Sequence, residues 1–360
     1  HHSAPRVLAC SRGEQVIATP RADRHPWAIN LATMFLASIA CPSLTARGGG
    51  GVLVVGSANV DLVAYAPRLP ASGETLAGLS FEQSPGGKGA NQAVAAAKLG
   101  SDVRFITQLG EDSMGEGSLA NYHAAGIDTT HIFRTSEAKT GVALITVNAE
   151  SGDNTIIVCP GAAGLLDEAQ LDAAADAFER SSVLLTQLEV PMPVTLGALR
   201  RARAAGLLTV CNTAPAPEDG LPDELLALCD VLCPNESEAA LLTGMPTGSD
   251  AECEAAARAL LAKGAGAVVM TLGARGCLLV SSEEAAPRRF AVPEAARRGA
   301  VVDTIGAGDA FLGALAHRLA AGTPLAEALP TAVFAATLSV QRQGAQASYA
   351  TRAELPSDVS

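Results

Sequence analysis

The chain has 360 residues, 48% of them apolar and only 3% aromatic, which suits one large α/β domain or two smaller ones built from small aliphatic side chains. The net charge is −12, and because residues 1–50 hold five arginines against Glu14 and Asp23, the remainder is more acidic still. An acidic body argues against nucleic acids and anionic membranes as partners.

Residues 1–50 differ in composition from the rest of the chain. They contain the apolar run "AINLATMFLASIA" (28–40), which is too short to span a bilayer. With arginines upstream, the run resembles a signal or transit segment, and the alternative is a disordered or loosely packed extension. We therefore expect one folded domain over residues 51–356, after the linker "RGGGG".

From Val52 onward, short apolar runs alternate with helical stretches. The runs are typical of buried strands, and several of the helical stretches end at glycine, as helices often do. This alternation predicts a mostly parallel sheet covered by helices on both faces. The predicted strands are "VLVVG", "VRFITQLG", "VLLTQLE", "LTVCNTAP", "VLCPNE", "VVMTLG" and "CLLVSS".

Two regions interrupt the alternation, near residues 60–85 and 130–158. Both read as extended strands joined by polar turns. We expect them to form antiparallel additions outside the parallel sheet. In α/β proteins, additions near the carboxyl ends of the strands can cover a ligand.

The segment "SPGGKGANQAVAAAKLG" (84–100) places Gly86, Gly87 and Gly89 directly before a helix. Three glycines in four residues let backbone N–H groups approach a ligand closely. A tight strand–helix turn without a ligand explains them as well. The spacing does not match a Walker A loop, because Lys88 is followed by glycine.

The segment "GSANVDLV" (56–63) follows the first predicted strand. Alternate side chains of an extended segment share a face, so Asn59 and Asp61 point the same way. An amide beside a carboxylate suits sugar hydroxyl groups, which both donate and accept hydrogen bonds. A turn with a local side-chain hydrogen bond is the alternative.

Two further segments are ambiguous. In "PNESEAALLTG", Asn235 and Glu238 are three residues apart at a helix start, which fits either an N-cap or a carboxylate that holds hydrated Mg²⁺ beside phosphates. In "TLGARG" (271–276), Thr271 and the glycines either line a nucleotide site or only turn the chain.

The segment "DTIGAGDAFLGALAHRLAAG" places Gly306, Ala307 and Gly308 at the start of a helix. The first N–H groups of a helix have no partner within it and carry partial positive charge, so a phosphate can bind there. Asp309 in that position is either an N-cap or a general base that takes the proton of an attacking hydroxyl.

Four motifs in order, "GSANVDLV", "GGKGANQAVAAAKLG", "PNESE" and "DTIGAGDAF", resemble those of the PfkB carbohydrate kinases over residues 52–356. The resemblance implies a ribokinase-like αβα sandwich with a small β-sheet lid, and cytoplasmic homodimers that pair through the lid. The added matches "TQLEVP", "NTAPAP" and "QGAQAS" imply transfer of the ATP γ-phosphate to the 5-hydroxyl of D-ribose.

The resemblance also implies roles for individual residues. Asp309 matches the catalytic base, and the backbone of Gly306, Ala307 and Gly308 the anion hole. Sugar contacts are expected from Asn59, Asp61, Gly86, Gly87, Lys88, Gly89, Asn91, Glu189 and Asp309. Nucleotide contacts are expected from Asn235, Thr271, Gly273, Arg275, Gly276 and Gly308, with Glu238 tied to Mg²⁺.

A monovalent cation, K⁺, is the second ion implied by the resemblance. It would activate the enzyme by stiffening the anion-hole loop without touching substrate. Ser339 departs from the family pattern, but a backbone carbonyl there could still bind the ion. The matching residues are Asp303, Ile305, Ser339, Arg342, Gly344 and Ser348.

Other functions remain open at this stage. Within the family, the alternatives are a fructokinase, a deoxyribokinase or a nucleoside kinase, although Asn59 and Asp61 favour a small polyhydroxylated sugar. A non-catalytic sugar or nucleotide sensor is disfavoured, because the base and the anion-hole glycines are present. The eight cysteines form no C-x-x-C pair and are expected to be buried free thiols. The N-terminal extension leaves organelle targeting open.

Overall fold

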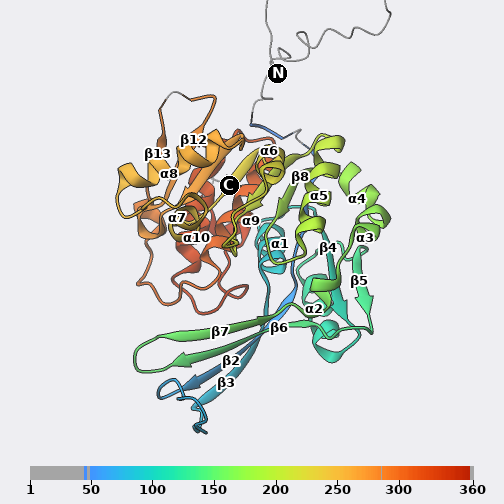
Figure 1. Cartoon of the computed structure of the whole chain (residues 1–360), viewed down its shortest axis with the longest axis vertical. Helices are drawn as coiled ribbons and strands as arrows, with labels where there is room; N and C mark the ends of the chain where they lie inside the picture. Colours follow the sequence, from blue (N-terminus) through green and yellow to red (C-terminus); the bar gives the residue numbers. More distant parts are fainter. Residues whose placement is uncertain (1–43, 47–48, 285, 357–360) are drawn as a thin grey trace, which may run out of the picture. The chain divides into compact units, whose positions relative to one another are not determined.

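The computed structural model describes residues 44–46, 49–284 and 286–356 (Figure 1). The apolar run 28–40 therefore lies outside the described residues. No helix within the described ranges has the length and apolar character needed to cross a membrane.

The main sheet confirms the predicted α/β architecture. Seven neighbouring strands, from β11 to β5 in the sheet order, are parallel, and β12 and β13 add an antiparallel edge. The order is β13 (Arg288–Phe290), β12 (Cys277–Ser281), β11 (Ala267–Thr271), β10 (Val231–Cys233), β9 (Leu208–Asn212), β8 (Ser181–Thr186), β1 (Gly51–Val55), β4 (Val103–Gly110) and β5 (Ile132–Thr135).

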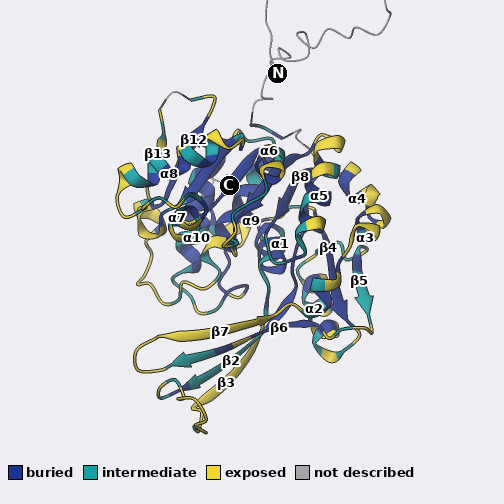
Figure 2. Cartoon of the chain, in the orientation of Figure 1, coloured by how far each residue is buried: buried dark blue, intermediate teal, exposed yellow. Residues whose placement is uncertain are grey.

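Strand β1 shows why the sheet needs helices on both faces. Successive side chains of a strand point to opposite faces, and Val52, Leu53, Val54 and Val55 are all fully buried. Val52 and Val54 belong to one core cluster and Leu53 and Val55 to the other. Figure 2 shows the strands of the main sheet as largely buried, in dark blue.

One helical layer carries the side chains of the first cluster, and the other layer those of the second. The first layer consists of α1 (Lys88–Lys98), α2 (Ser113–Ala124), α9 (Ala307–Ala320) and α10 (Leu325–Ser339). The second consists of α3 (Glu168–Ala173), α4 (Ala175–Glu179), α5 (Met192–Ala205), α6 (Asp223–Leu228), α7 (Glu236–Thr243) and α8 (Asp250–Ala262).

Local signals explain most helix ends. Helix α5 stops at Gly206, which adopts a left-handed conformation with φ 78°, and α8 begins at Ser249 with a capping box. The helical segment over 168–179 is divided at Ala174 into α3 and α4. Leu171 and Phe178, on either side of this break, belong to the same buried cluster.

A second, four-stranded sheet projects from the main body (Figure 1). We call it the lid, and its order is β3 (Ser80–Gly86), β2 (Asn59–Ala66), β6 (Gly141–Asn148) and β7 (Asn154–Cys159). The predicted separate sheet is therefore confirmed, but two details of the prediction were wrong. Strands β2 and β6 pair in parallel, and β5, predicted to lie outside the parallel sheet, extends it beside β4. Ile132 of β5 is buried in the core, which ties that strand to the main sheet.

Six cysteines lie within the described residues, and all six are free thiols. Five of them are buried as expected, and Cys159 at the end of β7 is exposed.

The folded domain begins before the predicted boundary at residue 51. Leu44 and Ala46 are each only 6% exposed and belong to the first core cluster. The carbonyl of Leu44 accepts a hydrogen bond from the Leu325 amide at the start of α10, at 3.1 Å. Leu44 and Ala46, which lie within the predicted extension, therefore pack into the core of the domain.

We expect a chain that starts at Cys41 to melt at the temperature of the parent, and one that starts at Gly50 to melt several degrees lower. Losing a buried leucine removes roughly 2 kcal/mol of hydrophobic stabilisation. Calorimetry of the two chains, with Leu44→Ala in the longer one as a matched control, measures the difference. Equal melting temperatures would show that this segment adds no stability.

Candidate active site

Asp309 lies in the first turn of α9 and is only 7% exposed. The helix is capped by Gly306, not by the Asp309 side chain, so the N-cap interpretation of this carboxylate is not supported. Its two oxygens accept hydrogen bonds from Asn91 Nδ2 at 3.0 Å and Gln92 Nε2 at 2.9 Å. Burial raises the pKa of Asp309, while Lys88 and the two amides oppose that rise.

Position 306 has room only for a glycine. Gly306 adopts a left-handed conformation with φ 73°, and a Cβ there would lie 2.6 Å from the Tyr349 hydroxyl oxygen. Any other residue would therefore strain the backbone and displace the loop that begins α9.

Lys88 stands among four carboxylates. Burial alone would lower its pKa, but Asp309, Glu189, Glu238 and Asp61 together raise it. The Lys88 backbone N–H also donates to Glu189 Oε2 at 3.0 Å, and Ser57 Oγ donates to the same oxygen. The start of α1 is thus tied to the loop after β8.

Asn59 and Asp61 share one face of β2, as predicted. Asn59 is 4% exposed, and its Oδ1 is buried with no hydrogen-bond partner among the described residues. Since buried polar atoms are nearly always hydrogen-bonded, this oxygen is available to a ligand. Burial, with Glu189 and Asp309 adding to it, raises the pKa of Asp61 to about 6.

The glycines before α1 allow this close packing. A Cβ on Gly86 would lie 2.2 Å from Asp61 Oδ1, and one on Gly87 would lie 2.7 Å from the Asn59 backbone nitrogen. Gly89 approaches the backbone of Gly56 and Ser57 equally closely. The three glycines therefore serve more than a tight turn, because they bring β2 and α1 together around the polar side chains.

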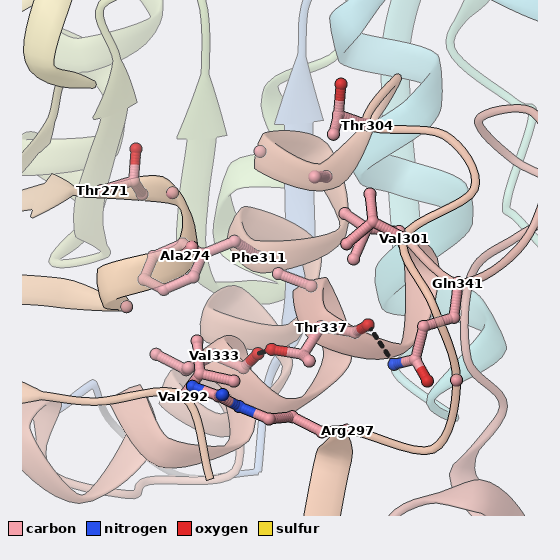
Figure 3. Close-up of a pocket in the computed structure, with 17 residues that line it drawn as sticks. Thr271, Ala274, Val292, Arg297, Val301, Thr304, Phe311, Val333, Thr337 and Gln341 are labelled. Carbon is pink, nitrogen blue, oxygen red and sulfur yellow. Dashed lines mark hydrogen bonds between the residues drawn. The ribbon is translucent and has the colours of Figure 1, made fainter. Parts of the chain in front are cut away.

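Two cavities meet at the start of α9. The smaller has a volume of about 190 Å³ and is lined by Lys88, Asn212, Asn235, Glu238 and Asp309, among others. The larger has a volume of about 600 Å³, and Figure 3 shows Val292, Phe311 and Val333 gathered in it beside Arg297. Both cavities are lined by Thr271, Thr304, Ala307 and Gly308.

Asn235 and Glu238 form a capping box at the start of α7, so the N-cap interpretation is confirmed for them. Glu238 Oε1 accepts from Asn235 Nδ2 at 2.8 Å, and Oε2 accepts from the Asn235 N–H and from Thr213 Oγ1, both at 3.0 Å. Its carboxylate nevertheless lines the smaller cavity. A capped carboxylate can still hold water molecules around Mg²⁺, because that ion usually keeps several waters.

The turn after β11 lines the larger cavity through Thr271, Gly273 and Gly276. Arg275 is not among the residues that line either cavity. Its guanidinium forms ion pairs with Glu236 and Asp250 and so holds this turn to α7 and to the start of α8.

The residues matched to a K⁺ site come from two loops that meet at Asp303. Asp303 Oδ1 accepts from the Ile305 N–H and Oδ2 from the Gly344 N–H, both at 2.9 Å. Arg342 Nη1 donates to the Ser348 carbonyl at 3.3 Å. Ser339, at the end of α10, bonds through its hydroxyl to Ala336. The Asp303 carboxylate therefore joins the loop of Ile305 to that of Gly344, while Ser339, Arg342 and Ser348 bond to other partners.

A set of buried amides and hydroxyls around the site was not predicted from the sequence. They lie within motifs already quoted, such as "GANQ", "TQLE" and "QGAQ", where a glutamine beside each assigned residue was the available signal. The missed residues are Ser57, Gln92, Gln187, Asn212, Thr213 and Gln346.

A buried carboxylate at a helix start, in a polar cavity that adjoins an apolar one, suits a kinase that acts on a small molecule. The chain belongs to the pfkB family of carbohydrate kinases, which it matches over residues 51–352. This membership agrees with the resemblance found in the sequence motifs.

Individual relatives are similar over most of the chain. A ribokinase of Mus musculus is 41% identical over 307 residues, covering 85% of this chain and 93% of that protein. A deoxyribokinase of Salmonella typhi is 38% identical over 298 residues, covering 83% and 95%. The structure of Arabidopsis thaliana ribokinase complexed with ribose and ATP has a TM-score of 0.78 at 32% identity, covering 85% and 97%.

We expect Asp61→Asn to stabilise the free protein at pH 7 but not at pH 4. A carboxyl whose pKa is raised from 3.8 to about 6 binds more protons folded than unfolded, so stability falls as pH rises through that interval. The full effect is at most about 3 kcal/mol, and partial solvent access reduces it.

Urea unfolding at both pH values measures this change, with Asp219→Asn at an exposed aspartate as the control. If Asp61→Asn were equally destabilising at pH 4 and pH 7, the ionised Asp61 would not be unfavourable in the folded protein.

Proposed function

We propose that the protein transfers the γ-phosphoryl group of ATP to the 5-hydroxyl of D-ribose, giving D-ribose 5-phosphate and ADP. The observation that carries this proposal is the buried Asp309 carboxylate beside the helix start that the two cavities share. The mouse and Arabidopsis ribokinases, similar over most of the chain, support ribose and ATP as the substrates.

The sugar lies between the lid and α1 in this proposal. Asn59 and Asp61 bind its hydroxyl groups together with Lys88, Asn91 and Glu189, and the loop of Gly86, Gly87 and Gly89 closes around it. The unpartnered Asn59 Oδ1 supports this role, because a sugar hydroxyl can donate to it.

The nucleotide occupies the larger cavity. The apolar side chains of Val292, Phe311 and Val333 suit a purine ring (Figure 3). Thr271, Gly273, Gly276 and Asn235 contact the nucleotide along the shared wall, and Arg275 contributes by holding their turn in place through its ion pairs.

The chemistry takes place at the start of α9. The backbone N–H groups of Gly308 and Asp309 in the first turn of α9 stabilise the charge on the transferring phosphoryl group. The Ala307 N–H donates to the Thr304 carbonyl at 3.3 Å and joins them when it exchanges this partner for a phosphoryl oxygen. Asp309 accepts the proton of the 5-hydroxyl as that oxygen bonds to phosphorus and the bond from phosphorus to the ADP oxygen breaks. Lys88, among the carboxylates, helps keep Asp309 ionised.

Mg²⁺, when bound with ATP, neutralises phosphate charge. Glu238 would hold this ion through water, since its oxygens face the smaller cavity while they serve the capping box.

The lid provides a surface for a second copy of the chain. Figure 2 shows exposed stretches along β3 and β7. Six large apolar side chains of the lid and the turn before it are 44–63% exposed, which is unusual for isolated surface strands. We infer a cytoplasmic homodimer that covers them, namely Leu79, Phe81, Leu144, Ile156, Ile157 and Val158.

We expect ATP-dependent ADP release with D-ribose, less with 2-deoxy-D-ribose, and little with fructose or nucleosides. In Asp309→Asn, kcat with ribose should fall roughly 10²–10⁴-fold, the usual worth of a positioned general base. Calorimetric ribose affinity should fall far less, because most contacts remain.

The similarity to a deoxyribokinase makes 2-deoxy-D-ribose the competing substrate. If kcat/KM is higher for 2-deoxy-D-ribose than for D-ribose, the proposed substrate is wrong and 2-deoxy-D-ribose takes its place. If Asp309→Asn turns over ribose at nearly the parental rate, Asp309 is not the general base.

We expect turnover to rise several-fold when K⁺ replaces Na⁺ or Tris at fixed ionic strength, and Asp303→Ala to abolish the difference. Asp303 joins the two loops whose carbonyl groups would hold the ion beside the anion hole. Steady-state rates in the three media measure the effect, and equal rates in the parent protein would refute it.

A further inference from the structure

Both oxygens of the Asp309 carboxylate are held by primary amides. Asn91 Nδ2 donates to Oδ2 at 3.0 Å, and Gln92 Nε2 donates to Oδ1 at 2.9 Å. Asn91 is 6% exposed and Gln92 is fully buried, so little water competes for these bonds. The two residues are consecutive in α1 and reach the carboxylate together.

Each amide is itself held at its carbonyl end. Gln346 Nε2 donates to Asn91 Oδ1 at 2.9 Å, and Asn121 Nδ2 donates to Gln346 Oε1 at 2.8 Å. On the other arm, Gln187 Nε2 donates to Gln92 Oε1 at 2.6 Å. The amide donors thus form two series of hydrogen bonds, called amide chains below, and both series end at the Asp309 carboxylate.

We propose that Gln346 and Gln92 are positioning residues for the phosphoryl-transfer base, which they hold ionised and correctly oriented through these two amide chains. The inference rests on the base role proposed for Asp309. A primary amide has a donor end and an acceptor end, so only one of its two orientations serves a carboxylate. Gln346 occupies the acceptor end of Asn91, and this selects the orientation that donates to Asp309.

The two amides leave acceptor positions on the Asp309 carboxylate free for a substrate hydroxyl. A carboxylate oxygen accepts about two hydrogen bonds, and one amide occupies one of these positions on each oxygen. The remaining positions can face a sugar hydroxyl. If Asn91 turned round, its carbonyl oxygen would face the carboxylate, which would remove a donor and add repulsion.

Charged and titratable groups around Asp309 set the background for this effect. They come from the lid, from α1, from the loop after β8 and from the segment after α10, namely Asp61, Lys88, Glu189 and Tyr349. Burial raises the pKa of Asp309, and Lys88, Gln92 and Asn91 oppose this. Removing an amide donor should therefore raise that pKa further.

The test is the pH dependence of kcat/KM for ribose in Gln92→Met and Gln346→Met, at saturating K⁺. Methionine keeps much of the length and removes the donor. The apparent pKa of the acidic limb of this kcat/KM profile should rise by about 1 unit in Gln92→Met, because one hydrogen bond to a charged group is lost. The shift in Gln346→Met should be smaller. Turnover at pH 7 should fall about tenfold in both variants, with KM for ATP unchanged within about twofold.

Gln108→Met is the matched control. Gln108 is 5% exposed and bonds to Gln170, away from Asp309. Its loss should cost comparable stability without moving the limb. The proposal is overturned if the apparent pKa of the acidic limb is unchanged in both Gln92→Met and Gln346→Met. If that pKa rises in Gln92→Met alone, the role of Gln346 is overturned. If Gln346→Met does not fold, Asn121→Leu tests the same chain from its half-buried end.

The two proposals fail separately. If Asp309→Asn keeps near-parental turnover, the base assignment fails. If Asp309→Asn is inactive but the limbs of Gln92→Met and Gln346→Met match the parent, only the positioning role fails.

Discussion

Asp309 is buried where its neutral form is favoured, and the groups packed around it oppose that preference. An isolated carboxylate in such a place would take up a proton. The opposing groups are the ammonium of Lys88, the amides of Asn91 and Gln92, and the positive start of α9. Three of these belong to α1, so α1 must lie directly against α9.

Small residues make that contact possible. A Cβ on Gly313 of α9 would lie 2.4 Å from the Ala95 Cβ of α1 and 2.8 Å from the Gln92 carbonyl oxygen. The shortage of aromatic residues in the chain therefore has a local meaning here, since bulky side chains would separate the two helices and withdraw the amides from Asp309. The same need for close approach explains the glycines at the other end of α1, which bring β2 and its polar side chains beside Lys88.

The residues proposed to bind the sugar and the amides that hold Asp309 differ in how completely they are hydrogen-bonded. The residues proposed to bind the sugar include Asn59, whose amide oxygen has no partner among the described residues, and Asp61, whose carboxyl has a raised pKa. Behind Asp309, by contrast, Gln92, Gln187 and Gln346 are hydrogen-bonded. Gln187 Oε1, at the far end of one of these series of amides, has no partner among the described residues. The two amides that contact Asp309 directly, those of Asn91 and Gln92, are hydrogen-bonded at both ends.

The sequence alone determined the alternation of strands and helices and the existence of a separate strand-rich region, because these depend on local periodicity. Glycine placement also located the helix start at Asp309, although it left open whether that side chain caps the helix or acts as a base. The sequence could not decide that β5 joins the main sheet or that Leu44 packs into the core, since an apolar or extended run does not specify its partner. The amide chains were equally hidden, because Asn91, Asn121 and Gln346 lie far apart in sequence and meet only when α1, α2 and the segment after α10 pack around Asp309.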